Sequence, residues 1–144
     1  MIKKDILLQQ YKLYVESAEK VSDRRQSANS YFLALNSLIL SFAGYLTTFS
    51  FRLWHIVIAA SGISISILWL LTLKSFRSLN SAKFKVIHSL EEDLPAELFK
   101  KEWEYLDRGK KKRTYLKLSL VEQGIPLIFI ILYVIIVILM IYIK

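Results

Sequence analysis

The sequence predicts an all-α, polytopic membrane protein with three transmembrane helices and a cytosolic helical region. The strongest observation is the run IPLIFIILYVIIVILMIYI from Ile125 to Ile143, which contains no charged residue. As a helix this run reaches roughly 30 Å, the thickness of the hydrocarbon core of a bilayer. Its Ile and Val residues would favour a strand in water, but an isolated strand in lipid would leave its backbone polar groups unpaired. In addition, 54% of the residues are hydrophobic although the net charge is +8, a combination typical of small membrane proteins.

The composition also limits the possible functions. A length of 144 residues suggests one domain. A basic chain can bind nucleic acid, but no such partner is expected, because the basic runs lack interleaved aromatic residues on a recognisable scaffold. The chain has no cysteine, which excludes disulfides, thiolate metal sites and cysteine nucleophiles. The N-terminal stretch has no continuous apolar region, so it is not expected to be a signal peptide.

Residues 1–29 are expected to form a cytosolic amphipathic helix. Apolar residues recur with a period close to 3.6, and acidic and basic residues fill the other face. The apolar positions include Ile6, Leu7, Tyr11, Ala18 and Val21. The mixture of charges favours packing on neighbouring cytosolic helices over the alternative, a helix lying in the lipid interface.

Residues 30–51 are expected to form the first transmembrane helix, which is less apolar than the last one. Small and polar side chains recur along it at short helical spacings, which places them on one face. These residues are Asn36, Ser37, Ser41, Gly44 and Thr48. Because small residues allow close backbone approach and polar ones can hydrogen-bond between helices, a helix-packing seam is favoured. The alternative is that this face lines a pore or a cavity.

Residues 53–73 are expected to form the second transmembrane helix, in which small residues again suit close packing. Lys74 and Arg77 end the apolar stretch, but the helical pattern continues without Gly or Pro until Pro95. The sequence therefore predicts one long helix that projects into the cytosol. That shape favours lateral contact with other copies of the chain.

Residues 74–118 are expected to form the cytosolic helical region. A second helix is predicted from Pro95 to Leu106, because Pro is acceptable in a first turn. Its predicted buried residues are Leu98, Phe99, Trp103 and Leu106. The basic residues of the following loop should contact anionic lipid headgroups, at about 1 kcal/mol per charge. They are Lys110, Lys111, Lys112 and Arg113.

Residues 119–143 are expected to form the third transmembrane helix. Ser119 and Glu122 match a capping box at its start. Glu122 also lies at the same predicted membrane edge as Arg25. Two interpretations remain open: Glu122 caps the helix only, or it forms an ion pair with Arg25 that holds the third span to the first.

The distribution of basic residues predicts the orientation. Lys and Arg are concentrated in residues 1–25 and 74–117, whereas the hairpin near Arg52 and the end at Lys144 hold one each. By the positive-inside rule, the N-terminus and the 74–117 region are cytosolic and the C-terminus lies outside.

No catalytic, cofactor-binding or metal-binding residue is predicted, and we expect no enzymatic activity. The sequence contains no Walker loop and no GxSxG, HExxH or DxDxG-type motif. With two histidines and no cysteine, we expect no metal site of imidazole or thiolate ligands. Glu91, Glu92 and Asp93 are adjacent, but adjacent residues on a helix point apart, so they do not form a catalytic pair.

Several segments resemble a known family. The stretches SDRRQSANSYFLALN, SFRSLNSAKFKVIHSLE and VEQGIP resemble, in pattern and order, the RipA family of small octameric membrane proteins from bacteria. The resemblance implies a multi-pass protein of the bacterial inner membrane that assembles as a homo-octameric ring, without known enzymatic activity. An early helix, two spans and a long cytosolic helix also resemble SLATT membrane effectors of bacterial conflict systems, whose membrane domain is thought to act as a pore. The third span departs from that second pattern.

The expected function is a structural or scaffolding ring, with the lipid bilayer and other copies of the chain as partners. The alternative is a channel or a membrane-permeabilising effector. The span that faces the ring axis distinguishes them. If the third span faces the axis, lipid fills the opening, whereas the face of Asn36, Ser37, Ser41 and Gly44 would give a hydrated path.

Overall fold

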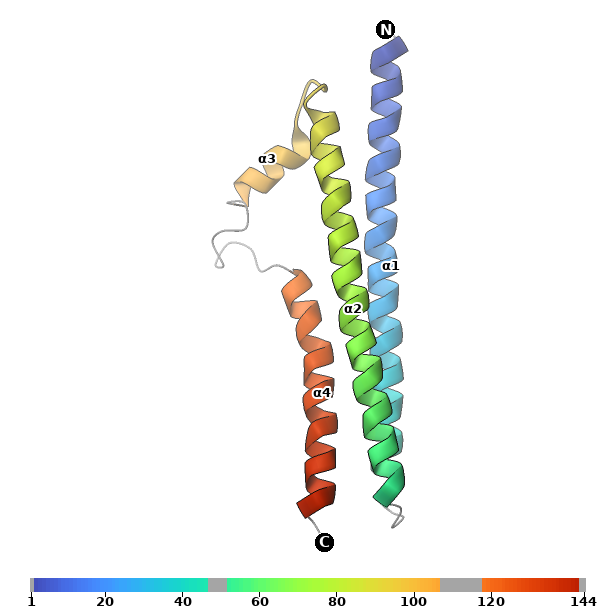
Figure 1. The fold of residues 1–144 in the computed structure, drawn as a ribbon. Coiled ribbons are helices and arrows are strands. Elements are labelled where there is room, and N and C mark those ends of the chain that lie inside the picture. Colours follow the sequence, from blue (N-terminus) through green and yellow to red (C-terminus); the bar gives the residue numbers. More distant parts are fainter. Residues whose placement is uncertain (1, 47–51, 107–117, 143–144) are drawn as a thin grey trace. The chain divides into compact units, whose positions relative to one another are not determined.

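The chain folds into four α-helices in the computed structural model, which describes residues 2–46, 52–106 and 118–142. The helices are α1 (Ile2–Leu46), α2 (Arg52–Glu91), α3 (Leu98–Tyr105) and α4 (Leu118–Tyr142), labelled in Figure 1. None of these described residues forms a strand. The predicted all-α class is therefore confirmed.

The helices α1 and α2 are long because no proline interrupts them. α1 has 45 residues and runs without a break through the predicted cytosolic helix and into the first predicted span. α2 has 40 residues and continues past the second predicted span, as the sequence predicts. It ends at Glu91, four residues before Pro95, because proline has no N–H to donate to the carbonyl four residues earlier and its ring would clash with that carbonyl.

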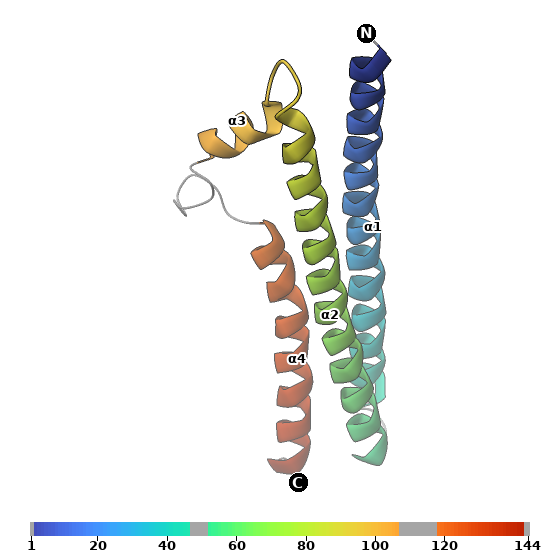
Figure 2. The same cartoon turned by 45° about the horizontal axis from the view of Figure 1, so that its top comes forward.

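The chain divides into two compact units, and the boundaries fall inside α1, α2 and the first turn of α4. We call Met1–Arg25 with Ser75–Leu120 the charged unit, and Gln26–Lys74 with Val121–Lys144 the apolar unit. In the charged unit, the N-terminal part of α1 lies beside the C-terminal part of α2, as both views show (Figures 1 and 2). In the apolar unit, α4 packs with the remaining parts of α1 and α2.

Two helices of the described residues are long and apolar enough to cross a membrane, where the sequence predicted three. They are Leu53–Glu91, whose uncharged part is 53–73, and Val121–Tyr142. Residues 30–46 of α1 do not qualify, because Asn36 and small polar residues dilute the apolar ones, and 47–51 lie outside the described residues. Only 28% and 17% of the two apolar windows are buried, so neither helix is the covered core of a soluble protein.

The short helix α3 differs from its prediction. It begins at Leu98 and not at Pro95, and none of its residues is fully buried. Leu98 and Trp103, which were expected to be buried, are exposed. The reason is that a helix of only eight residues contacts its unit along one face, which leaves its other apolar side chains uncovered.

The helix α4 closely follows the predicted third span, but its start differs. It begins at Leu118, so Ser119 lies within the helix and not at the capping position before it. Pro126 lies inside α4 and is buried. Because proline lacks a backbone N–H, the Glu122 carbonyl loses its helical hydrogen-bond donor at that point.

Candidate functional site

The apolar unit contains a buried polar network centred on Asn36. The Asn36 Oδ1 atom accepts a hydrogen bond from the Ser66 hydroxyl at 2.9 Å, and its Nδ2 atom donates to the Phe32 carbonyl at 2.9 Å. The Tyr133 hydroxyl donates to the Asn36 carbonyl at 3.1 Å, with Asn36 Oδ1 at 3.4 Å. The network therefore joins α1, α2 and α4, and it pairs the Oδ1 atom, the backbone carbonyl and one side-chain N–H of Asn36.

An aromatic cluster adjoins this network. The Trp69 indole N–H donates to Asn29 Oδ1 at 2.8 Å. The Trp69 ring stacks on Phe32 at a centroid distance of 5.9 Å and lies 6.2 Å from Phe129. Both Trp69 and Tyr133 are fully buried and belong to the core of this unit. Large rings and satisfied polar groups together fix the relative register of the three helices.

Gly62 allows the closest approach in this unit. A Cβ atom added to Gly62 would overlap the Tyr133 ring, whereas one added to Gly44 or Gly124 would meet nothing within 4 Å. The absence of a side chain at Gly62 therefore lets the Tyr133 ring lie directly against the α2 backbone. Small residues at such positions permit tight helix packing in membranes.

The predicted face of small and polar residues divides into two parts. Asn36 is fully buried, whereas Ser37, Ser41 and Gly44 are exposed in the single chain. The Ser41 hydroxyl donates to the Ser37 carbonyl at 2.8 Å, so it is satisfied within its own helix. Thr48 lies outside the described residues. The role of this face as a packing seam or a pore lining stays a prediction.

Two further expectations also stay predictions: the ion pair between Glu122 and Arg25, and the lipid contacts of the basic loop. Arg25 belongs to the charged unit and Glu122 to the apolar unit, so their proposed ion pair is not defined by either unit alone. The basic residues Lys110, Lys111, Lys112 and Arg113 lie outside the described residues.

The charged unit contains a buried carboxylate, Glu91, that sequence reasoning missed. Its Oε1 atom accepts hydrogen bonds from the Tyr11 hydroxyl at 3.0 Å and the Phe99 N–H at 2.9 Å, and its Oε2 atom accepts one from the Lys100 N–H at 3.2 Å. Glu91 therefore caps the N-terminus of α3 from α2 and also connects it to α1. Glu97, which precedes α3, makes no side-chain cap.

The surroundings of Glu91 and Tyr11 shift the pKa of both side chains. Burial opposes ionisation of Glu91, but hydrogen bonds from the Phe99 N–H, the Tyr11 hydroxyl and the Lys100 N–H outweigh it and lower its pKa. Burial, followed by the hydrogen bond to Glu91, raises the pKa of Tyr11 to about 12. The carboxylate is thus held ionised and the phenol neutral, which is the pairing that a capped helix N-terminus requires.

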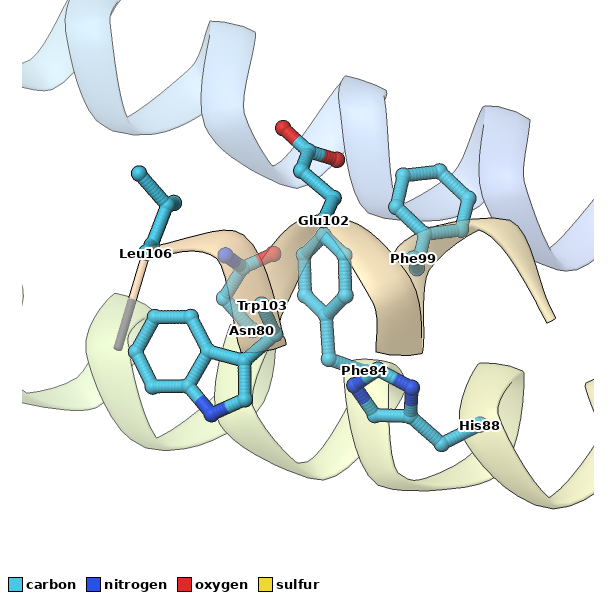
Figure 3. A pocket seen from close by; sticks show the side chains of 7 residues that line it. All are labelled: Asn80, Phe84, His88, Phe99, Glu102, Trp103 and Leu106. Atoms are coloured by element: carbon cyan, nitrogen blue, oxygen red, sulfur yellow. The ribbon is translucent and has the colours of Figure 1, made fainter. Parts of the chain in front are cut away.

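A cavity of about 370 Å³ lies between α2 and α3 (Figure 3). Aromatic rings dominate its lining, and one leucine, two polar residues and one acidic residue complete it. The lining residues are Asn80, Phe84, His88, Phe99, Glu102, Trp103 and Leu106. The described residues contain no group of three or more His, Asp or Glu side chains that could hold a metal ion. Binding here would thus rest on aromatic, apolar and carboxylate contacts.

The fold and the network define the class of the protein. Its apolar helices are mostly uncovered in the single chain, and its buried polar groups connect helices, which is the arrangement of a helical membrane protein. The chain belongs to the octameric membrane protein family (8xMP), whose model matches residues 8–142. The predicted membership of an octameric membrane protein family is thereby confirmed. No curated protein and no solved structure matches the chain.

Proposed function

We propose that the protein is a structural or scaffolding ring of eight copies in the bacterial inner membrane, without enzymatic activity. The observation that supports this role most is the satisfaction of Asn36 by Ser66 and Tyr133 within one chain. A polar group that already has its partners does not need water, so this network holds the helices of one chain together. Such hydrogen bonds contribute about 1 kcal/mol each in membranes.

The surface of the apolar unit supports assembly with other copies. Along α4, large apolar side chains are exposed in the single chain, among them Leu127, Ile128, Ile131 and Ile135. Lipid tails cover such side chains as well as a protein does, so they do not drive association by themselves. The exposed stripe of Ser37, Ser41 and Gly44 differs, because small residues let a second helix approach closely. We therefore place the contact between copies on this stripe.

We further propose that residues 30–51 cross the membrane as a third, more polar span, with residues 1–29 and 74–118 in the cytosol and the C-terminus outside. The polar Asn36 of this span is compatible with lipid because it bonds to Ser66 of α2 and Tyr133 of α4. Asn29, just before the span, accepts from Trp69 of α2. With two spans only, the two ends of the chain would lie on the same side of the membrane. With three, they lie on opposite sides.

Single cysteines should locate the two ends of the chain, because the protein has none of its own. Leu13, Tyr105 and Tyr142 are 65%, 85% and 81% exposed and suit a thiol label. In intact spheroplasts, an impermeant maleimide should label Tyr142→Cys and should label Leu13→Cys and Tyr105→Cys only after permeabilisation. Labelling of Leu13→Cys together with Tyr142→Cys from outside would establish two spans.

A channel is the second candidate, supported by the exposed hydroxyls of the Ser37 stripe. We expect the purified octamer in liposomes to show no ion flux above that of empty liposomes. Ion flux through the wild-type octamer would contradict the scaffolding role. If Ser41→Leu then abolished this flux and Ser64→Leu did not, the result would favour a channel lined by the Ser37 stripe. Ser64 is a matched control, because it is also exposed and its hydroxyl also donates to a carbonyl four residues earlier.

A further inference from the structure

The cavity between α2 and α3 has an acidic and aromatic lining in a strongly basic chain. The sequence holds 20 Lys and Arg residues against 12 Asp and Glu. Nevertheless, the lining includes Phe84, Phe99, Trp103 and Glu102, and no Lys or Arg of the described residues. This composition disfavours an anionic ligand.

A second cavity of about 200 Å³ adjoins the same two phenylalanine rings. Phe84 and Phe99 meet edge to face at a centroid distance of 5.6 Å and border both cavities. Glu19 and Asp23 of α1 line the second cavity, again without a Lys or Arg among the described residues. Glu102 and Glu19 therefore place an acidic residue at each of the two cavities, and negative charge there favours a cation over an anion.

Two buried polar atoms of the first cavity have no hydrogen-bond partner in the described part of the chain. The Oδ1 atom of Asn80 has no donor among the described residues, and the Nδ1 atom of His88 lies 3.6 Å from a Glu91 oxygen, beyond hydrogen-bond distance. Buried polar atoms are nearly always paired in native proteins, so the oxygen of Asn80 can take a further partner, whereas His88 Nδ1 already faces the Glu91 carboxylate. The oxygen of Asn80 can only accept, so its partner must carry an N–H or O–H group.

We propose that this cavity binds a primary alkylammonium compound. The ammonium group would lie against the aromatic faces, near Glu102, and donate to Asn80 Oδ1. The alkyl stem would contact the rings and Leu106. The volume lies within the range of small-molecule sites, about 300–1,000 Å³. Aromatic faces attract ammonium groups electrostatically, and a neighbouring carboxylate adds to that attraction. The site is independent of the proposed scaffold role, since all its residues belong to the charged unit.

The full-length protein in neutral detergent should bind 1,5-diaminopentane saturably in isothermal titration calorimetry. The uncharged 1,5-pentanediol has the same length and should show no measurable binding. We expect Glu102→Gln and Trp103→Leu each to weaken the binding affinity for the diamine by about fivefold or more. Glu92→Gln is the matched control, because Glu92 is exposed, lines neither cavity and should leave the affinity unchanged.

Trp103→Phe keeps an aromatic face and should bind with intermediate affinity. Circular dichroism melting of each variant should show that the helices are intact, which separates a lost site from a lost fold. Equal binding of the diol and the diamine, or unchanged affinity in both Glu102→Gln and Trp103→Leu, would overturn the proposal. Absence of diamine binding by the wild-type protein would overturn it as well, whatever the flux experiment shows.

Discussion

Glu91→Ala should lower the free energy of unfolding of the charged unit by about 3 kcal/mol. The substitution leaves the N–H groups of Phe99 and Lys100 and the hydroxyl of Tyr11 without their acceptor. The first turn of α3 would then lose its only observed side-chain cap, and limited proteolysis should cut near α3 faster than in the wild type. Denaturation in detergent, followed by circular dichroism, measures the free energy.

Glu92→Ala provides the control, because its carboxylate is exposed and adjacent in sequence. We expect that variant to stay within about 0.5 kcal/mol of the wild type. Glu91→Gln should fall between the two, since its amide keeps one acceptor oxygen. A loss in Glu91→Ala no greater than in Glu92→Ala would show that the buried network does not stabilise the unit.

Low pH should reproduce part of the loss of stability that Glu91→Ala causes. The pKa of Glu91 is lower in the folded unit than its ordinary value of 4.5. Its stabilising contribution is therefore present above pH 4.5 and is lost as the pH falls through the folded pKa. The pKa of Tyr11 is raised to about 12, so its contribution is present below its ordinary value of 10.0 and is lost as the pH rises towards about 12. Melting temperatures of Glu91→Gln should fall less steeply below pH 4.5 than those of the wild type.

The long helices were predictable because their signals are local. An uncharged run between Ile125 and Ile143 specifies α4, and the absence of proline up to Pro95 specifies the length of α2. The role of Glu91 is less evident, since it is one of three adjacent carboxylates. A usable signal was present, because Phe84, Ile87 and Glu91 follow one another at spacings of three and four on one helix face. It shows that Glu91 continues a buried face while Glu92 and Asp93 do not.

The partners of Asn36 could not be derived from local pattern. Ser66 and Tyr133 lie 30 and 97 residues away in the sequence. The spacing of small residues predicts a face that includes Asn36 and Ser41, but only the fold shows that the first is buried and the second exposed. The polar composition that reduces the apolarity of residues 30–46 is therefore the same feature that connects α1 to its neighbours.

Gly62→Val should destabilise the apolar unit by about 3 kcal/mol, because the new side chain overlaps the Tyr133 ring. The ring cannot move aside cheaply: it is fully buried, and its hydroxyl donates to the Asn36 carbonyl. Gly44→Val meets open space in the single chain and is the matched control for stability. Unfolding in a mixed-detergent titration measures both.

Removing the Tyr133 ring tests whether its overlap with residue 62 causes the loss of stability. In the Gly62→Val background, Tyr133→Leu frees the space above residue 62, so the double variant should lose less stability than the sum of the two single losses. If the losses add, the overlap is not the source of the effect. Gly44→Val should also differ from Gly62→Val in kind: it preserves the folded chain but blocks the small-residue stripe. We therefore expect it to reduce the octamer, measured by mass photometry, whereas Gly62→Val lowers stability first.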